Sequence, residues 1–185
     1  MPAEAGRVRV LGLDPGSLRT GWGVVEPAPD GRRLSLVAGG TIVSPAAWPF
    51  SERLRHIFEQ TRQVIKRHQP LELAVEGVFT AKNARTALLL GQARGVALLA
   101  GALAGLSIHE YAPAAVKKAL VGSGRAGKEQ VRIMVEALLQ QTLPPPREFS
   151  LDASDALAIA VCHLHSRALR GLAARTPPPG TRGPR

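Results

Sequence analysis

The stretch Val8–Ser17, VRVLGLDPGS, decides the fold of this 185-residue chain, because an apolar strand enters the core there and ends on a carboxylate. The residues up to Leu13 have the composition of a buried strand, and Pro15 and Gly16 mark a turn directly after it. In α/β proteins, functional sites usually lie at the edge of the sheet where the parallel strands end. Asp14 is therefore the first candidate functional residue, although an acid before Pro-Gly can also serve only to make the turn.

The pattern of apolar runs predicts an α/β fold. Strands at Gly21–Glu26 and Leu34–Val43 are joined by the turn sequence PAPDGR, which indicates an antiparallel meander with the first strand. Two later strands alternate with helices, and such crossovers imply parallel pairing of the first, fourth and fifth strands. The predicted sheet is mixed and five-stranded, with three antiparallel strands and two parallel additions, and helices flank it. The other predicted elements are strands Leu71–Phe79 and Ser107–Tyr111, a helix between Ser51 and Pro70, and helices Lys82–Ala104, Pro113–Val121, Lys128–Gln140 and Leu151–Leu172.

The charge and cysteine content narrow the class of protein. There are 24 Lys and Arg against 14 Asp and Glu, and this net charge of +10 indicates a polyanionic partner, nucleic acid or an anionic membrane. The alternative is a protein that is thermally robust or generally basic. The single cysteine, Cys162, excludes an internal disulfide and fits a reducing, cytoplasmic location. The most apolar stretch, Val96–Ile108, has 13 residues, which is too short to span a bilayer. It predicts a buried helix, and no membrane role is expected.

The chain is expected to contain one domain and a short tail. Residues 1–172 are long enough to bury one core. Residues 173–185, AARTPPPGTRGPR, are rich in Pro, Gly and Arg, which predicts a disordered basic tail. Within the last predicted helix, Cys162, His163 and His165 do not have the spacing of a metal site, and they are expected to be ordinary helix residues.

Three further acids are predicted to lie near Asp14. Glu76 is near the end of the strand expected to neighbour the first one. Asp152 and Asp155, in LDASDALAIA, are three residues apart, so both lie on one face of a helix. Each acid has an ordinary explanation, since acids are favoured at helix N-termini and strands often end on polar residues. Their combination in otherwise apolar elements nevertheless favours a shared site.

Four carboxylates at one spot would repel one another and resist ionising together. Divalent cations remove this conflict, and ligands that are all oxygen favour Mg²⁺ or Mn²⁺. Two such ions, roughly 4 Å apart, hold a phosphodiester, activate water and stabilise the leaving oxygen. The combination of a basic protein with an acidic site for two metal ions therefore predicts a nuclease.

A glycine-rich basic stretch adds candidate phosphate contacts. Lys117 and Lys118 begin KKALVGSGRAGK, where cationic side chains and exposed backbone N–H groups suit phosphate binding. The alternative is a solvated basic surface. Part of this stretch, Gly122–Lys128, also matches the start of a P-loop, but Glu129 stands where Ser or Thr should bind Mg²⁺. Nucleotide binding is therefore not expected.

Small residues recur four apart along the long helix that begins at Lys82. Ala93, Ala97, Gly101 and Gly105 form such a stripe, and Gly91 and Gly95 form another pair. Small side chains at this spacing allow another element to approach closely. The approaching element could be the sheet or a second subunit.

Four segments of the chain, in this order, resemble the RuvC family of Holliday junction resolvases, which have an RNase H-like fold. They extend from residue 11 to about residue 163, so the resemblance covers nearly the whole of the predicted domain, 1–172. The segments are GLDPGSLRTGWGVVE, AVEGVFTAKNARTALLLGQARGVALLAG, YAPAAVKKALVGSGRAGKEQV and DASDALAIAVCH.

The resemblance implies a homodimeric, cytoplasmic endonuclease that resolves four-way DNA junctions in recombination and repair. It would nick two opposing strands symmetrically, leave a 5′-phosphate and a 3′-hydroxyl, and work with the RuvA–RuvB branch-migration complex. Its metal-binding catalytic acids fall on Asp14, Glu76, Asp152 and Asp155, and its catalytic lysine on Lys117. Phe79 matches an aromatic that approaches the bases. The expected DNA contacts are Phe79, Lys117, Lys118, Lys128 and Arg85.

Three other functions compete with this interpretation. Another RNase H-like nuclease would cut RNA–DNA hybrids or RNA, and relative rates on a hybrid and a junction distinguish it. An actin-like sugar kinase or ATPase can share the Gly-x-Asp-x-Gly pattern of the first strand, but it needs a second half for which 185 residues leave no room. The presence of all four acids argues against a non-catalytic junction-binding scaffold.

Overall fold

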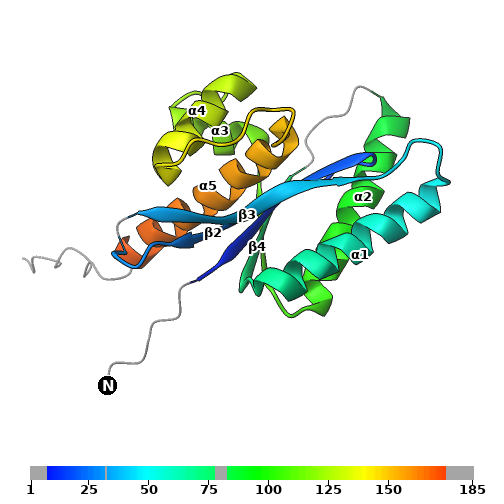
Figure 1. Cartoon of the computed structure of the whole chain (residues 1–185), viewed down its shortest axis with the longest axis horizontal. Helices are drawn as coiled ribbons and strands as arrows, with labels where there is room; N and C mark the ends of the chain where they lie inside the picture. The colour runs from blue at the N-terminus through cyan, green and yellow to red at the C-terminus, as the bar shows by residue number, and fades with distance from the viewer. Residues whose placement is uncertain (1–7, 32, 78–82, 174–185) are drawn as a thin grey trace, which may run out of the picture.

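The computed structural model describes residues 8–31, 33–77 and 83–173 (Figure 1). In these residues one mixed sheet has the strand order β3-β2-β1-β4-β5. The first three strands pair antiparallel, whereas β1 pairs with β4, and β4 with β5, in parallel. The predicted fold class is therefore confirmed. The elements are β1 Val10–Asp14, β2 Arg19–Pro27, β3 Leu34–Val43, α1 Phe50–His68, β4 Glu72–Glu76, α2 Ala84–Leu103, β5 Ser107–Tyr111, α3 Pro113–Val121, α4 Lys128–Leu139 and α5 Leu151–Ala173.

Two predicted features lie at or beyond the limits of the described residues. Phe79 falls outside them. The predicted tail, residues 173–185, also lies outside them except for Ala173, the last residue of α5. The division of the chain at residue 172 therefore stays a prediction.

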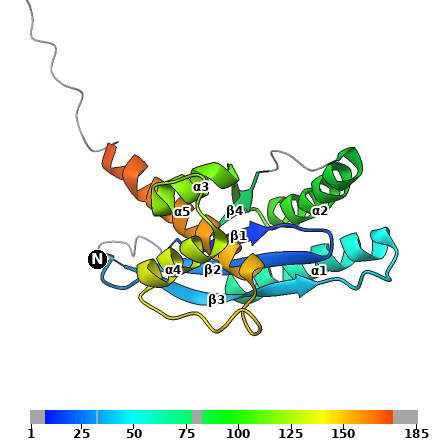
Figure 2. The same ribbon diagram turned by 90° about the horizontal axis from the view of Figure 1, so that it is seen from above.

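Helices cover both faces of the sheet (Figures 1 and 2). On one face, α1 and α2 run side by side; on the other, α5 lies along the strands with α3 and α4 beyond it. Alternate residues of β1 enter opposite cores, with Val10 towards α5 and Leu11 and Leu13 towards α1 and α2. Because both faces are buried, the strand reads as one continuous apolar run.

The backbone of α5 is in direct contact with glycines of β1 and β2. A Cβ added to Gly12 would lie 2.0 Å from the carbonyl oxygen of Ala156, and one added to Gly21 would lie 1.9 Å from that of Asp152. A Cβ at Gly23 would lie 2.4 Å from the Leu157 side chain. Real side chains do not tolerate such distances to backbone atoms, so only glycine allows α5 to lie this close to the sheet.

The small residues of α2 pack against the sheet. Ala93, Ala97 and Gly101 are buried, and a Cβ added to Gly101 would lie 2.4 Å from the Leu73 side chain of β4. Of the two partners left open by the sequence, this stripe therefore uses the sheet. Gly91 and Gly95 lie outside that contact, with nothing within 4 Å of an added Cβ.

The predicted buried helix at Val96–Ile108 is wrong in extent and in burial. The helix ends at Leu103 and the chain then enters β5 at Ser107. Leu99 is 50% exposed and Leu103 is 68% exposed, because only one face of α2 meets the rest of the fold. By length and composition alone, α2 could cross a membrane, and 22% of its most apolar window is buried in the protein. The same test is passed by core helices of proteins outside membranes, so it is weak evidence here.

We expect Gly21→Ala to destabilise the fold by about 1–3 kcal/mol, because the new methyl group overpacks the contact with the α5 backbone. The midpoint of urea denaturation measures this change. Gly171→Ala is the matched control, since Gly171 lies in the same helix with nothing within 4 Å of an added Cβ. Gly171→Ala should leave the folding stability unchanged or raise it by up to about 1 kcal/mol, because Ala has a higher helix propensity than Gly. Equal stability of Gly21→Ala and wild type would contradict the close approach.

Candidate active site

Carboxylates from three elements meet at one edge of the sheet. Asp14 ends β1 and Glu76 ends β4, and the parallel register that pairs Leu13 with Val75 places these two ends side by side. Asp14 is paired across the sheet with Gly21, which in turn lies under the backbone of Asp152 in α5. The contact between α5 and Gly21 therefore brings the first turn of the helix to the strand ends.

We call Asp14, Glu76, Asp152 and Asp155 the acidic cup. Three of these acids, all except Asp155, line a cavity of about 320 Å³. Asp155 lies within electrostatic range of both Asp14 and Glu76. The structure thus brings together all four acids that the sequence singled out. The other lining residues of the cavity are Pro15, Gly16, Arg19, Gly77, Leu90, Arg94 and Pro113.

The carboxyl groups of the acidic cup resist ionising together. Burial raises the pKa of Asp14 to about 8, and the charges of Glu76 and Asp155 add to the effect. Burial also raises the pKa of Glu76, although a hydrogen bond with Asp14 opposes the rise. A pKa of about 8 favours the protonated form of Asp14 at neutral pH. All four acids can therefore ionise together only when additional positive charge is bound at the site.

Two cationic side chains pair with the acids of α5. Lys128 Nζ lies 2.5 Å from Asp155 Oδ2, and Arg19 Nε lies 2.8 Å from Asp152 Oδ2. Burial by itself would lower the pKa of Lys128, but its hydrogen bond with Asp155 and the charges of the neighbouring acids raise it. Lys128 thus stays charged at the rim of the acidic cup.

The other predicted basic residues differ in their distance from the acids. Lys117, on α3, is half-buried, and its charge lowers the pKa of Glu76 against the effect of burial. Lys118 is exposed on α3, and Arg85 is exposed in the first turn of α2. Within the described residues, no contact ties Lys118 or Arg85 to the acidic cup, so their role in DNA binding stays a prediction.

Two arginines of this site were not predicted from the sequence to belong to it. Arg19 opens β2 five residues after Asp14, and a turn followed by antiparallel pairing returns it to the end of β1. Arg94 Nε donates a hydrogen bond to the carbonyl oxygen of Glu76, 3.1 Å away, and the guanidinium also pairs with Glu110. A signal existed for Arg94, since it is the sole charged residue of α2 after Thr86.

The donors of the acidic cup fit Mg²⁺ or Mn²⁺. They are all carboxylate oxygens, the ligands that these hard cations prefer. Burial is the first cause of the raised pKa of Asp14 and of Glu76, and neighbouring carboxylates add to it although Lys128 opposes the rise. Bound divalent cations would supply further positive charge.

Comparisons with known proteins agree with this site. Residues 10–163 match the family model "Crossover junction endodeoxyribonuclease RuvC". The protein of that name from Azorhizobium caulinodans is 51% identical over 162 residues, which are 88% of this chain and 92% of that protein. The solved structure of Thermus thermophilus RuvC is 34% identical with a TM-score of 0.76, covering 88% of this chain and 96% of that one. T. thermophilus RuvC in complex with Holliday junction substrate is 33% identical with a TM-score of 0.77, at the same coverage.

We expect the affinity for Mg²⁺ to rise with pH up to about pH 8, because an ion that binds Asp14 must displace its proton. Below that pH the affinity should fall about tenfold per pH unit for each proton released. Calorimetric titration of the full chain with Mg²⁺ at several pH values measures this slope. An affinity that does not change with pH would contradict the protonated state of Asp14.

Asp14→Asn supplies the control for this titration. Its Mg²⁺ binding should be weaker and should depend less on pH, since the titrating group is gone. Folding stability depends on pH in the opposite direction. The pKa of Asp14 is higher in the folded state than in the unfolded state, so stability without divalent cations should fall as the pH rises towards about 8. Asp14→Asn should remove that fall, as the melting temperature at each pH would show.

Proposed function

The chain belongs to the RuvC family of crossover junction endodeoxyribonucleases, and from this premise we propose that the acidic cup is the site at which it cuts four-way DNA junctions. The chain is a nuclease of the Holliday junction endonuclease class. The observation that carries the assignment of the site is the convergence of four carboxylates from β1, β4 and α5 in a protein of net charge +10. Basic surface attracts DNA, and the acids supply the cation site for hydrolysis.

We infer that the acidic cup holds two divalent cations, Mg²⁺ or Mn²⁺, with Asp14, Glu76, Asp152 and Asp155 as ligands. When bound, two such ions lower the pKa of water and stabilise negative charge on the phosphodiester. Asp14 gives up its proton when the cations bind. Arg19 and Lys128 orient the carboxylates of α5, to which they donate hydrogen bonds.

The cationic side chains around the acidic cup are proposed to hold the phosphate. Lys117 is close enough to act electrostatically on Glu76, and a fixed cation there stabilises charge that develops on the phosphate oxygens. Lys128 lies at the first residue of α4, where the helix N-terminus also favours an anion. Cleavage is expected to leave a 5′-phosphate and a 3′-hydroxyl, with Phe79, Lys118 and Arg85 as further proposed DNA contacts.

We expect Asp152→Asn to lower the rate of junction cleavage at least about 10²-fold while junction binding is kept, because it removes charge that holds cations but preserves the shape of the side chain. Cleavage of a labelled synthetic four-way junction in Mg²⁺ and in Mn²⁺, together with a gel shift, measures the two effects. Glu129→Gln is the matched control: Glu129 is an exposed acid next to Lys128 and does not belong to the acidic cup.

The substrate in this experiment decides between the two candidate nuclease functions. The junction should be cut faster than an RNA–DNA hybrid of the same sequence. Faster cleavage of the hybrid would favour an RNase H-like activity on hybrids. Normal cleavage by Asp152→Asn would remove that residue from the catalytic site.

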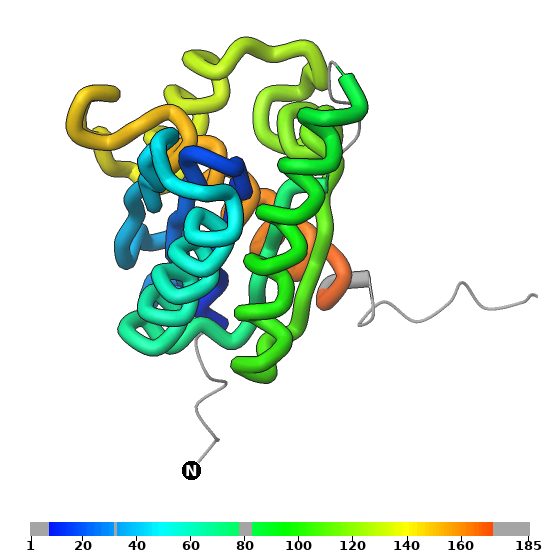
Figure 3. Tube along the Cα trace, turned by 90° about the vertical axis from the view of Figure 1, so that its right-hand side faces the viewer, coloured from blue at the N-terminus to red at the C-terminus, as the bar shows by residue number. Residues whose placement is uncertain are grey.

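We further infer that the chain works as a homodimer through α2. The exposed residues Leu88, Leu99 and Leu103 share one side of α2 with Gly91 and Gly95. In Figure 3, α2 lies on the outside of the described fold with no other element over it. Two glycines without neighbours allow a second helix to approach closely, and a two-fold dimer suits a junction cut on two opposing strands.

A dimer also accounts for the apolar character of α2 better than a membrane does. Arg94, near the middle of the helix, pairs with Glu110 of β5, so its charge is compensated by a neighbouring strand of the same fold. We therefore propose a cytoplasmic enzyme without a membrane role, which Cys162, buried and unpaired, also fits. A partnership with the RuvA–RuvB complex follows from the family alone and stays part of the proposal.

We expect Leu99→Lys to convert the dimer to a monomer, because it places a charge in the middle of the proposed apolar contact. Sedimentation equilibrium measures the mass in solution. Ile133→Lys is the matched control, since Ile133 is 58% exposed on α4 and lies outside this stripe. A Leu99→Lys chain that remains dimeric, or a wild type that is monomeric at every concentration, would disprove the role of α2.

A further inference from the structure

A second polar cluster lies at the other end of β4. The strand reads ELAVE, and Glu72 faces α5 as Glu76 does, because the two are four residues apart. His109 comes from the neighbouring β5, where it is paired with Ala74, and His163 comes from α5. One ligand atom from each of Glu72, His109 and His163 lies within 4.8 Å of the others. None of these residues belongs to the acidic cup.

His163 is completely buried and bonded at both ring nitrogens. Its Nδ1 lies 2.7 Å from the hydroxyl oxygen of Tyr111, and its Nε2 is hydrogen-bonded to Oε2 of Glu72. Burial lowers the pKa of His163 although Glu72 opposes this, so we take the ring as neutral. In the neutral ring, Nε2–H donates to Glu72 and Nδ1 accepts from Tyr111.

His109 completes the cluster. Its ring lies against that of His163, with centroids 4.4 Å apart and ring planes tilted by 34°. Among the described residues, no hydrogen bond involves a ring nitrogen of His109, although it lies beside the half-buried carboxylate of Glu72 and a second imidazole. A half-buried ring with uncommitted nitrogens in this position is suited to bind a cation.

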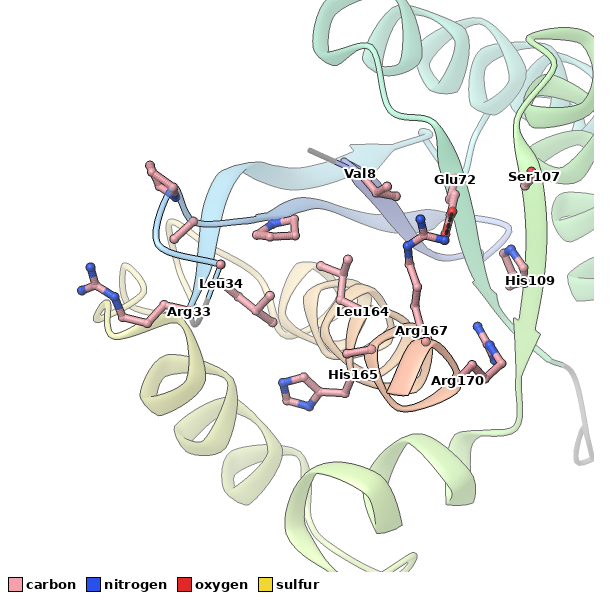
Figure 4. A pocket seen from close by; sticks show the side chains of 16 residues that line it. Val8, Arg33, Leu34, Glu72, Ser107, His109, Leu164, His165, Arg167 and Arg170 are labelled. Atoms are coloured by element: carbon pink, nitrogen blue, oxygen red, sulfur yellow. Dashed lines mark ion pairs between the residues drawn. The ribbon is translucent and has the colours of Figure 1, made fainter. Parts of the chain in front are cut away.

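A cavity of about 1460 Å³ leads to this cluster from solvent. Glu72 and His109 line it, and Figure 4 shows both on the wall formed by β4 and β5. Arg167 of α5 reaches the same wall, where it pairs with Oε1 of Glu72 at 3.0 Å. His165 lines the cavity too, but it points away from Glu72. The cavity provides an entry path and room for a water molecule as a further ligand.

We propose that Glu72, His109 and His163 form a second metal site, which binds Zn²⁺. Two imidazole nitrogens and one carboxylate oxygen are a ligand set that Zn²⁺ takes with a fourth position left open to water. Mg²⁺ prefers oxygen ligands only, so the chemistry of the donors separates this site from the acidic cup. The ion would tie β4, β5 and α5 together at the edge of the sheet opposite the acidic cup.

The hydrogen bonds around the cluster suit this ion. When Nε2 of His163 binds Zn²⁺, the ring proton moves to Nδ1, which then donates to the Tyr111 oxygen, the usual arrangement behind a metal-bound histidine. Arg167 holds Oε1 of Glu72 and leaves Oε2 for the metal. Its positive charge and that of Arg170, which also lines the cavity, lower the affinity for Zn²⁺. We therefore expect weaker binding than at a closed cysteine site.

Binding of Co²⁺ and Zn²⁺ to the full chain in excess Mg²⁺ tests the proposal. Co²⁺ should bind saturably, with the visible absorption of a site that has nitrogen ligands, and Zn²⁺ should displace it. Zn²⁺ should also raise the melting temperature, because an ion that binds the folded chain alone stabilises it. His109→Gln should weaken Zn²⁺ binding at least about tenfold, and Tyr111→Phe about 10–100-fold.

Two variants locate the bound ion. His165→Gln changes a histidine of the same cavity outside the cluster, and Asp152→Asn changes the acidic cup; both should keep the wild-type affinity for Zn²⁺. Binding that is lost in Asp152→Asn but kept in His109→Gln would place the ion in the acidic cup and overturn the proposal. Absence of saturable Co²⁺ and Zn²⁺ binding to the wild type would overturn it as well. The outcome does not depend on the nuclease assignment, since no cleavage is measured.

Discussion

The acidic cup depends on the close contact between the backbone of α5 and the glycines of β1 and β2. At Gly12 and Gly21 there is no room for even a methyl group below the helix, and the helix presents small residues, Ala153 and Ala156, to the strands. This contact fixes the distance and the direction of α5. Because Gly21 is paired with Asp14, the same contact sets where the first turn of α5 meets the end of β1. Packing therefore determines the position of the charges.

Burial and mutual repulsion of the carboxylates in the acidic cup oppose folding. Positively charged groups offset part of this cost. Burial keeps a proton on Asp14 at neutral pH, and Arg19 and Lys128 compensate the acids of α5. A site with fewer acids would fold more easily, but it would bind divalent cations more weakly. Binding of a cation and deprotonation of Asp14 are therefore linked, because the cation competes with the proton for the same carboxylate.

The sequence predicted the elements and the four acids because both follow from local patterns. Strand ends gave Asp14 and Glu76, and helical spacing gave Asp152 with Asp155. The features that could not be predicted from the sequence depend on tertiary contacts. The contact of Arg19 with Asp152 joins residues 133 positions apart. The burial of α2 was overestimated, since an apolar run does not say whether a helix meets one partner or two. His163 was expected to be an ordinary helix residue because, within one helix, the spacing offers no partner; its neighbours come from β4 and β5.

Strand β4 and helix α5 each carry residues of both polar clusters, one cluster at each end of the strand. Glu72 and Glu76 lie at the two ends of β4 on the same face, about 13 Å apart at the usual rise of a strand. Along α5, Asp155 and His163 are eight residues apart, which returns to the same face of the helix after about two turns. The end that carries oxygen ligands alone suits hard cations, and the end with two imidazoles suits Zn²⁺. The close contact of α5 with the sheet therefore keeps the ligands of the two proposed cation sites apart at opposite ends of β4.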